Sequence, residues 1–207
     1  SNYVEASRYI LKSSDQEFPE AAVDCLNNAV AQARRAAGVI KSLRRFVGKD
    51  DSVRVPEALN EAIREISALA SMGTGVDGVR LDLELADGLP PVPIDRVQIQ
   101  QVIANLMRNA TESMKESPQR VLSISSRQDS GHELVVAISD TGPGMSADAL
   151  DKLFEPFHSS KPGGMGIGLT ISKKIIESHG GRLWVAPNSD GGAIFHFSLP
   201  LEEESGV

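Results

Sequence analysis

Apolar residues recur at alternating intervals of three and four along residues 20–47, with glutamine, arginine and lysine between them. The stripe consists of Val23, Leu26, Val30, Ala33, Ala37, Ile40 and Val47. This spacing predicts a helix with a bundle seam. Residues 3–11 also predict a helix, and the polar stretch 13–19 between the two makes them a hairpin. We expect two copies of the hairpin to dimerise into a four-helix bundle, the alternative being a hairpin packed on its own domain.

A charged break at residues 49–53 separates the hairpin from a different pattern. Residues 56–70 have helical periodicity. Residues 79–85 alternate between aliphatic and charged side chains, which predicts a half-buried strand. A proline-rich turn at 90–93 leads to Asp95, the predicted N-cap of a long helix over 96–115.

The rest of the pattern predicts four strands and one further helix. The strands are expected over 121–126, 134–139, 182–186 and 193–199, and the helix over 169–178. This order predicts an α+β fold in which a mixed sheet is covered on one face by helices. We therefore expect a helical hairpin over 1–48, an α/β sandwich over 52–201 and a disordered tail over 202–207.

The composition argues against several classes of protein. The net charge of -7 gives no overall attraction to phosphate backbones, so nucleic-acid binding is not expected. No run of about 18 apolar residues is present, so no membrane segment is expected in this chain. The single cysteine, Cys25, excludes a disulfide within the chain and fits a reducing cytoplasm.

Three amide side chains share one stripe of the helix predicted after Asp95. Gln101, Asn105 and Asn109 are spaced by four residues among apolar neighbours. Amide oxygens suit a hard divalent cation, and amide groups also bond ribose or phosphate-bound water. The alternative is that these are polar positions facing solvent.

Two short segments add candidate ligand contacts. Asp140 ends a predicted strand and precedes Gly142 and Gly144, so a carboxylate that can read an amino group stands beside glycines that let a ligand approach the backbone. The segment could instead be only a tight turn. Phe154 and Phe157 precede a polar, glycine-rich stretch and could anchor a movable lid, or could be ordinary core aromatics.

Two glycine-rich runs follow. Residues 163–168 stand directly before the predicted helix 169–178, so free backbone N–H groups can face phosphates. Such loops are common, and this one lacks the lysine and hydroxyl pair of a P-loop. The second run, 191–195, by itself predicts only a turn and a strand.

The order and spacing of these segments closely resemble the GHKL superfamily and, within it, bacterial sensor histidine kinases, closest to the FixL type. The boxes are 105–110 for the N box, 140–144 for G1, 154–157 for F, 164–168 for G2 and 191–195 for G3. The resemblance covers about 55–200 and implies a Bergerat-type α/β sandwich. The residues after Ser1 also resemble the FixL-type dimerisation helix just beyond its H box.

The resemblance implies a role for each matching residue in binding ATP and Mg²⁺. Asn109 would be the Mg²⁺ ligand, Asn105 would orient the phosphates, and Asp140 would read the adenine amino group. The other residues of the implied nucleotide site are Gly142 and Gly144 in the adenine pocket, Phe154 and Phe157 at the lid root, Lys161 as a positive charge for the phosphates, and Gly164, Gly166, Gly168 and Leu169 at the phosphate-facing end of the lid.

The implied activity is that of an ATP-dependent protein-histidine kinase. Its histidine would pass the phosphoryl group to an aspartate in the receiver domain of a response regulator. The gyrase and chaperone branches place a water-activating glutamate where this chain has Asn105, which argues against hydrolysis. A nucleotide-binding signalling module without transfer and a GHKL ATPase remain the alternatives.

Two features depart from the family pattern. Ala193 stands where the G3 region commonly has threonine. The H box would precede Ser1, because His132, His158, His179 and His196 lie in other contexts. We therefore expect this sequence to be a piece of a longer chain whose acceptor histidine lies upstream.

Overall fold

The computed structural model describes residues 26–30, 33, 53–72, 78–129, 132–146, 149–150, 152–156, 166–188 and 191–201. The chain divides into two compact units, Ser1–Lys49 and Asp50–Val207. In the first unit, residues 26–30 and 33 are helical and Val30 is buried. The rest of the predicted hairpin, its dimerisation, Cys25 and the tail 202–207 lie outside the described residues.

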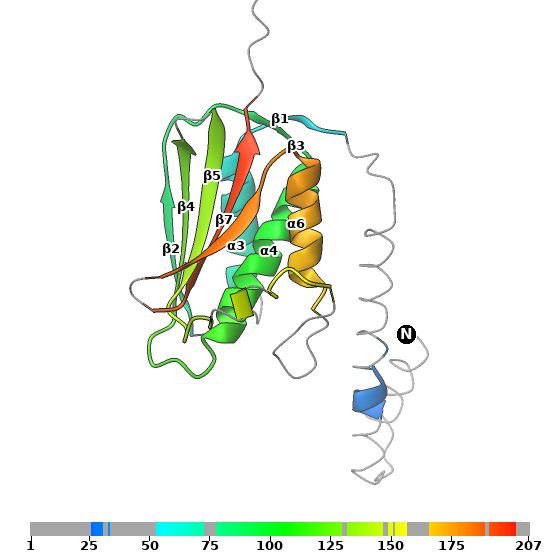
Figure 1. The fold of residues 1–207 in the computed structure, drawn as a ribbon, viewed down its shortest axis with the longest axis vertical. Helices are drawn as coiled ribbons and strands as arrows, with labels where there is room; N and C mark the ends of the chain where they lie inside the picture. Colours follow the sequence, from blue (N-terminus) through cyan, green and yellow to red (C-terminus); the bar gives the residue numbers. More distant parts are fainter. Residues whose placement is uncertain are drawn as a thin grey trace, which may run out of the picture. The chain divides into compact units, whose positions relative to one another are not determined.

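The second unit is built on a five-stranded sheet in the order β2-β4-β5-β7-β6 (Figure 1). The strands are β2 (Arg80–Leu85), β4 (Val121–Asp129), β5 (Glu133–Asp140), β6 (Leu183–Pro187) and β7 (Ala193–Pro200). Strands β2 and β4 run parallel, because a helix returns the chain between them, and the other neighbours are antiparallel. The mixed sheet expected from the sequence is confirmed.

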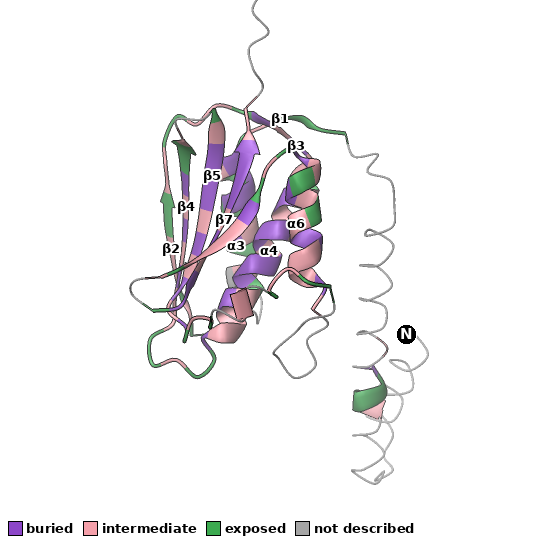
Figure 2. Cartoon of the chain, in the orientation of Figure 1, coloured by how far each residue is buried: buried purple, intermediate pink, exposed green. Residues whose placement is uncertain are grey.

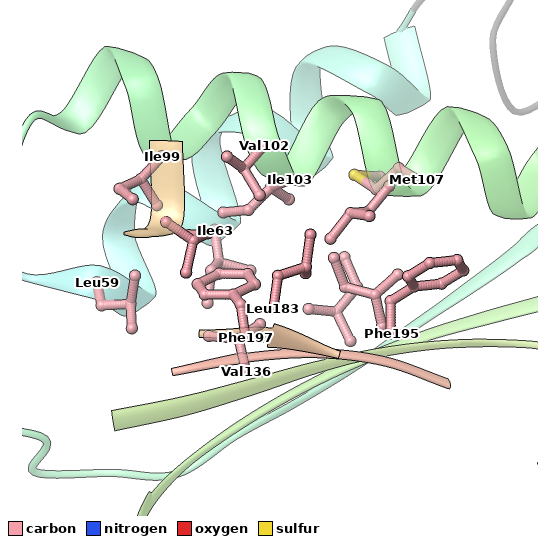
Figure 3. Packing of buried hydrophobic residues seen from close by; sticks show 14 of the residues in the cluster. Leu59, Ile63, Ile99, Val102, Ile103, Met107, Val136, Leu183, Phe195 and Phe197 are labelled. Carbon is pink, nitrogen blue, oxygen red and sulfur yellow. The ribbon is translucent and has the colours of Figure 1, made fainter. Parts of the chain in front are cut away.

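Three helices, α3 (Leu59–Met72), α4 (Arg96–Ser113) and α6 (Gly168–Ser178), cover one face of this sheet (Figure 1). Their buried sides face the strands (Figure 2). Figure 3 shows apolar side chains of α3 and α4 packed against Val136, Phe195 and Phe197 of the sheet. Burial of each such side chain stabilises the fold by about 1.5–3 kcal/mol, which explains why the helices are held to this face. The α+β class is confirmed.

The region before α4 differs from the sequence prediction. Strand β1 (Val55–Glu57) pairs antiparallel with β3 (Val92–Ile94), where we expected a helix from residue 56 and a turn at 90–93. Pro56 lies opposite Pro93 in this ladder. Proline has no backbone N–H group to donate, so these two residues are tolerated in a short sheet of only two strands. Helix α3 starts at Leu59 instead.

Helix α4 begins as predicted and ends earlier than predicted. The Asp95 carboxylate accepts a hydrogen bond from the Gln98 backbone N–H at 3.1 Å, which confirms the N-cap. The helix ends at Ser113 instead of residue 115. Beyond it, the Arg120 guanidinium donates to the carbonyl oxygens of Met114 and Lys115 at 2.8 and 2.7 Å, so the chain turns back toward β4. None of the described helices is both long and apolar enough to cross a membrane.

His179 joins the end of α6 to the start of α4. Its Nδ1 lies 2.8 Å from the Ile175 carbonyl oxygen, and its Nε2 accepts a hydrogen bond from the Asp95 backbone N–H at 3.0 Å. These partners assign the neutral tautomer that carries its proton on Nδ1. The residue is 4% exposed. His179 therefore has a structural role in the fold and is not accessible as an acceptor of a phosphoryl group.

His196 lies on the sheet face away from the helices, stacked on the only tryptophan of the chain. The ring centroids of His196 and Trp184 are 5.1 Å apart, and the planes differ by 13°. The His196 Nδ1 atom is buried without a hydrogen-bond partner among the described residues. Burial, and secondly the charge of Arg127, lower the pKa of His196 below the usual 6.5.

We expect this lowered pKa to make the fold less stable in mild acid. Below about pH 6.5 the unfolded chain takes up a proton that the folded ring resists, so the free energy of unfolding falls until the lowered pKa is reached. His196→Phe keeps the stacking and removes the titration. Urea unfolding followed by Trp184 fluorescence should therefore show a smaller loss of stability between about pH 7.5 and 5.5 in the variant. Equal losses in both proteins would contradict this assignment.

Candidate functional site

The predicted site residues come from α4, the end of β5 and the start of α6, which meet at the same end of the unit (Figure 1, lower part). Asp140 is the last residue of β5, and Asn105 and Asn109 lie in the second half of α4. Gly168 and Leu169 open α6. Phe157, Lys161, Gly164 and His158 lie outside the described residues, so their predicted roles stay predictions.

Asp140 is a buried carboxylate with defined donors. It is 3% exposed, and its Oδ1 accepts a hydrogen bond from the Gly142 backbone N–H at 2.8 Å and a longer one, at 3.2 Å, from the Ser113 hydroxyl, whose single proton is shared with the Ala110 carbonyl oxygen at 2.7 Å. A charge removed from water requires such partners. The two donors hold the carboxyl group in one orientation at the end of the strand.

Glycine backbones pack closely against this carboxylate. A Cβ atom on Gly142 would stand 2.7 Å from Asp140 Oδ1, and one on Gly192 would collide with the carbonyl oxygen of Asp140 and stand 2.6 Å from Oδ1. Gly144 and Gly192 also have left-handed φ angles of 75° and 84°. A side chain at position 142 would therefore displace the Asp140 carboxylate or Ser113, and one at position 192 would collide with the backbone of Asp140.

Two residues that position Asp140 were missed by the sequence analysis. The Asn188 side-chain amide donates to the Asp140 carbonyl oxygen at 2.9 Å and to the Ser139 hydroxyl at 3.0 Å. Ser113, the other, continues the four-residue spacing of Asn105 and Asn109, which is a signal that could have identified it. Asn188 lies between β6 and β7 and carries no comparable signal.

Asn105 is buried between α4 and α6. It is 8% exposed, its amide nitrogen donates to the Ser172 hydroxyl at 3.0 Å, and its Oδ1 accepts from Arg108 at 2.8 Å. A Cβ on Gly168 would stand 2.5 Å from that oxygen, so a side chain at position 168 would displace the Asn105 amide. The alternative of a solvent-facing amide is therefore wrong for Asn105, whereas Asn109 is half-buried.

The start of α6 has no side-chain cap. Its N-cap residue is Ile167, preceded by Gly166 with a φ of 62°, and its first turn holds no acidic residue. The first N–H groups of a helix need acceptors, and together with the helix dipole they favour an anion. The helix start beside Asn105 is therefore suited to phosphate oxygens.

Phe154 is attached to the same helix. The Thr170 hydroxyl donates to the Phe154 carbonyl oxygen at 3.3 Å, and the Lys173 ammonium lies 5.2 Å from the centroid of the ring. The ring is half-buried against the core. Phe154 thus fixes the chain just before residues 157–165 to α6.

The described residues fit the two ends of a magnesium nucleotide. The Asp140 carboxylate with its glycine neighbours suits a flat ring bearing an amino group, and the start of α6 suits phosphates. No group of three or more His, Cys, Asp and Glu side chains gathers for a metal in the part of the chain that the structure describes. A Mg²⁺ ion at this site would be held by an amide oxygen such as that of Asn109. Ala193, which stands where the family commonly has threonine, is 5% exposed and packs into the core.

Comparison with known proteins agrees with this geometry. Residues 94–203 match the family described as histidine kinase-, DNA gyrase B- and HSP90-like ATPase. The sensor protein FixL of Bradyrhizobium diazoefficiens is 41% identical over 205 residues, which cover 99% of this chain and 41% of FixL. The sensor protein TdiS of Thauera aromatica is 35% identical over 85% of this chain and 33% of its own length. The chain thus spans well under half of these relatives.

A solved structure has the same fold as the described domain. The catalytic domain of histidine kinase ThkA superposes with a TM-score of 0.64 at 32% identity, covering 72% of this chain and 96% of that domain. The matched boxes, the Asp140 site and this likeness lead to one assignment. The chain belongs to the histidine kinase-, DNA gyrase B- and HSP90-like ATPase family, as a member of its sensor histidine kinase branch.

Proposed function

We propose that this region binds Mg-ATP and transfers its γ-phosphoryl group to a histidine outside this sequence, from which a response regulator aspartate receives it. The observation that carries the proposal is the buried Asp140 carboxylate in its glycine surroundings, joined through α4 to Asn105 at the uncapped start of α6. The site offers one group for an amino-bearing ring and another for phosphates.

At the ring end, Asp140 accepts a hydrogen bond from the adenine amino group. The Ser113 hydroxyl and the Gly142 N–H fix the carboxylate through Oδ1, and Asn188 fixes its main chain. Because these partners are in place before ATP arrives, little ordering is needed on binding. Gly142 and Gly144 keep the backbone close to the ring.

At the phosphate end, positioning and charge perform the chemistry. The bond between the γ-phosphorus of ATP and the β–γ bridging oxygen breaks, ADP leaves with that oxygen, and the phosphorus bonds to an imidazole nitrogen. No water molecule therefore needs activation. Asn105 cannot act as a base, because a carboxamide is not basic at neutral pH; its amide instead donates to Ser172 and accepts from Arg108. A bound Mg²⁺, held by Asn109, would neutralise phosphate charge, and Lys161 remains the predicted cation of the lid.

The proposed partners are a second copy of the chain, joined through the hairpin, and a receiver domain. Two solved structures share this fold: ShkA in complex with AMPPNP, with a TM-score of 0.79 at 22% identity, and ThkA in complex with the response regulator TrrA, with 0.72 at 24%. Their bound molecules correspond to the nucleotide and the partner that we propose. A cytoplasmic location follows from the need for ATP.

The test supplies the missing histidine in trans. We would mix this chain with labelled Mg-ATP and a longer version that includes the segment preceding Ser1 and carries Asn109→Ala. Acid-labile label is expected on the longer protein, because this chain provides the nucleotide site and its partner the histidine. A matched reaction in which both proteins carry Asn109→Ala should remain unlabelled.

Two results would argue against transfer. If mixed dimers form and calorimetry shows bound nucleotide but no label appears, the region is a nucleotide-binding signalling module. Steady release of phosphate without a protein acceptor would identify an ATPase instead.

A further inference from the structure

Arg108 is an exposed cation held at the phosphate end of the site. It lies one turn after Asn105 on α4, and its Nη2 donates to the Asn105 Oδ1 at 2.8 Å. No carboxylate pairs with its guanidinium among the residues that the structure describes. Four of the five N–H donors of an arginine are therefore left for solvent or a ligand.

The amide that holds Arg108 is itself held against α6. Ser172 accepts from the amide nitrogen of Asn105, while Asn105 Oδ1 lies against the first residue of α6, Gly168. One oxygen atom thus contacts both the guanidinium and the first turn of the helix. The side chain of Arg108 is thereby kept next to the α6 N-terminus.

This location is electrostatically unfavourable for a cation in isolation. The N-terminus of a helix carries about half a positive charge, so an arginine beside it is repelled and a negative side chain is favoured. Helix α4 shows the usual arrangement, with Asp95 at its start, whereas α6 has neither a cap nor an acidic residue in its first turn. An anion bound between the two would compensate both positive charges.

We propose that Arg108 binds the terminal phosphates of ATP together with the α6 N-terminus, an inference that rests on the proposed function of the site. A guanidinium keeps its proton throughout, so it offers a fixed charge and paired N–H donors to phosphate oxygens. Asn105 then has a second role in the site, because its oxygen aims the guanidinium of Arg108 at the phosphates.

Calorimetry with a series of ligands tests this assignment. For Arg108→Ala, affinity for Mg-ATP should fall about tenfold or more, affinity for Mg-ADP less, and affinity for adenosine should not change, since a charge-assisted contact to phosphate is lost. Arg108→Gln can still donate to Asn105 but carries no charge, so it should show the same dependence on the number of phosphates. Arg64→Ala, which removes an exposed arginine of α3, is the matched control and should bind all ligands as the unmodified chain does.

The outcomes separate the inference from the proposed function. If the unmodified chain prefers ATP to adenosine, and Arg108→Ala and Arg108→Gln weaken all ligands equally or none, Arg108 does not bind phosphate and the inference fails alone. If the unmodified chain binds no adenine nucleotide, both fail. A loss confined to the phosphate-bearing ligands in both variants, with thermal unfolding unchanged, supports the inference.

Discussion

Gly192→Ala should both destabilise the domain and remove nucleotide binding. The added Cβ would collide with the carbonyl oxygen of Asp140, a backbone atom inside the sheet that cannot rotate away. We expect a loss of about 2–5 kcal/mol in the free energy of unfolding, the sum of about 1–3 kcal/mol for the backbone shift and about 1–2 kcal/mol for the left-handed φ. Because the same shift moves the Asp140 carboxylate, affinity for ATP should fall at least about tenfold in the fraction that remains folded.

The neighbouring glycine provides the control. Gly191 has a φ of 94°, close to the 84° of Gly192, but its added Cβ would meet nothing nearer than the Gly142 carbonyl oxygen at 3.6 Å. Gly191→Ala should therefore cost only the conformational term, about 1–2 kcal/mol, and keep ATP binding. Denaturant unfolding and calorimetry on the two variants measure the collision directly. Similar losses in both would mean that Gly192 is needed for its φ alone.

Local signals made much of the fold predictable. The Asp95 cap, the apolar period of α4 and the alternation in β5 each depend on residues within a few positions of one another, and these elements form as expected. Asp140 was identified because it stands at the end of a recognisable strand and before glycines. Dependence on local signals also explains why the prediction was wrong at residue 56, where the helical pattern was extended over β1. The pairing of β1 with β3 depends on residues about 37 positions away, which a local pattern does not include.

The supporting contacts of the site were not predictable in this way. Ser113 reaches Asp140 across 27 positions, and Asn188 reaches it across 48. Whether such side chains meet depends on the strand register and on how α4 lies across the sheet, which one sequence does not specify. The requirement for glycine at position 192 likewise arises from a strand distant in sequence. Spacing thus led to the residues that we propose to face the ligand, and tertiary packing was needed to show which side chains contact and hold them.

Asp140→Asn should reverse the base preference of the site while leaving the fold intact. The two side chains have the same shape, and the amide oxygen can keep the hydrogen bonds that Gly142 and Ser113 now donate to Oδ1. The other oxygen becomes an NH₂ group, a donor facing the adenine amino group, which is also a donor. Affinity for ATP should fall at least about a hundredfold, because a buried polar pair is left unmatched.

Inosine triphosphate makes this prediction specific, since its 6-oxo group is an acceptor where adenine has a donor. Asp140→Asn should bind inosine triphosphate more tightly than ATP, whereas the unmodified chain should prefer ATP. Asp87→Asn, which removes one negative charge at an exposed turn, controls for the change in net charge and should leave both affinities unchanged. Competition calorimetry with the two nucleotides gives the ratio. Equal weakening of both nucleotides in Asp140→Asn would mean that the carboxylate supports the pocket without reading the base, and the adenine assignment would have to be withdrawn.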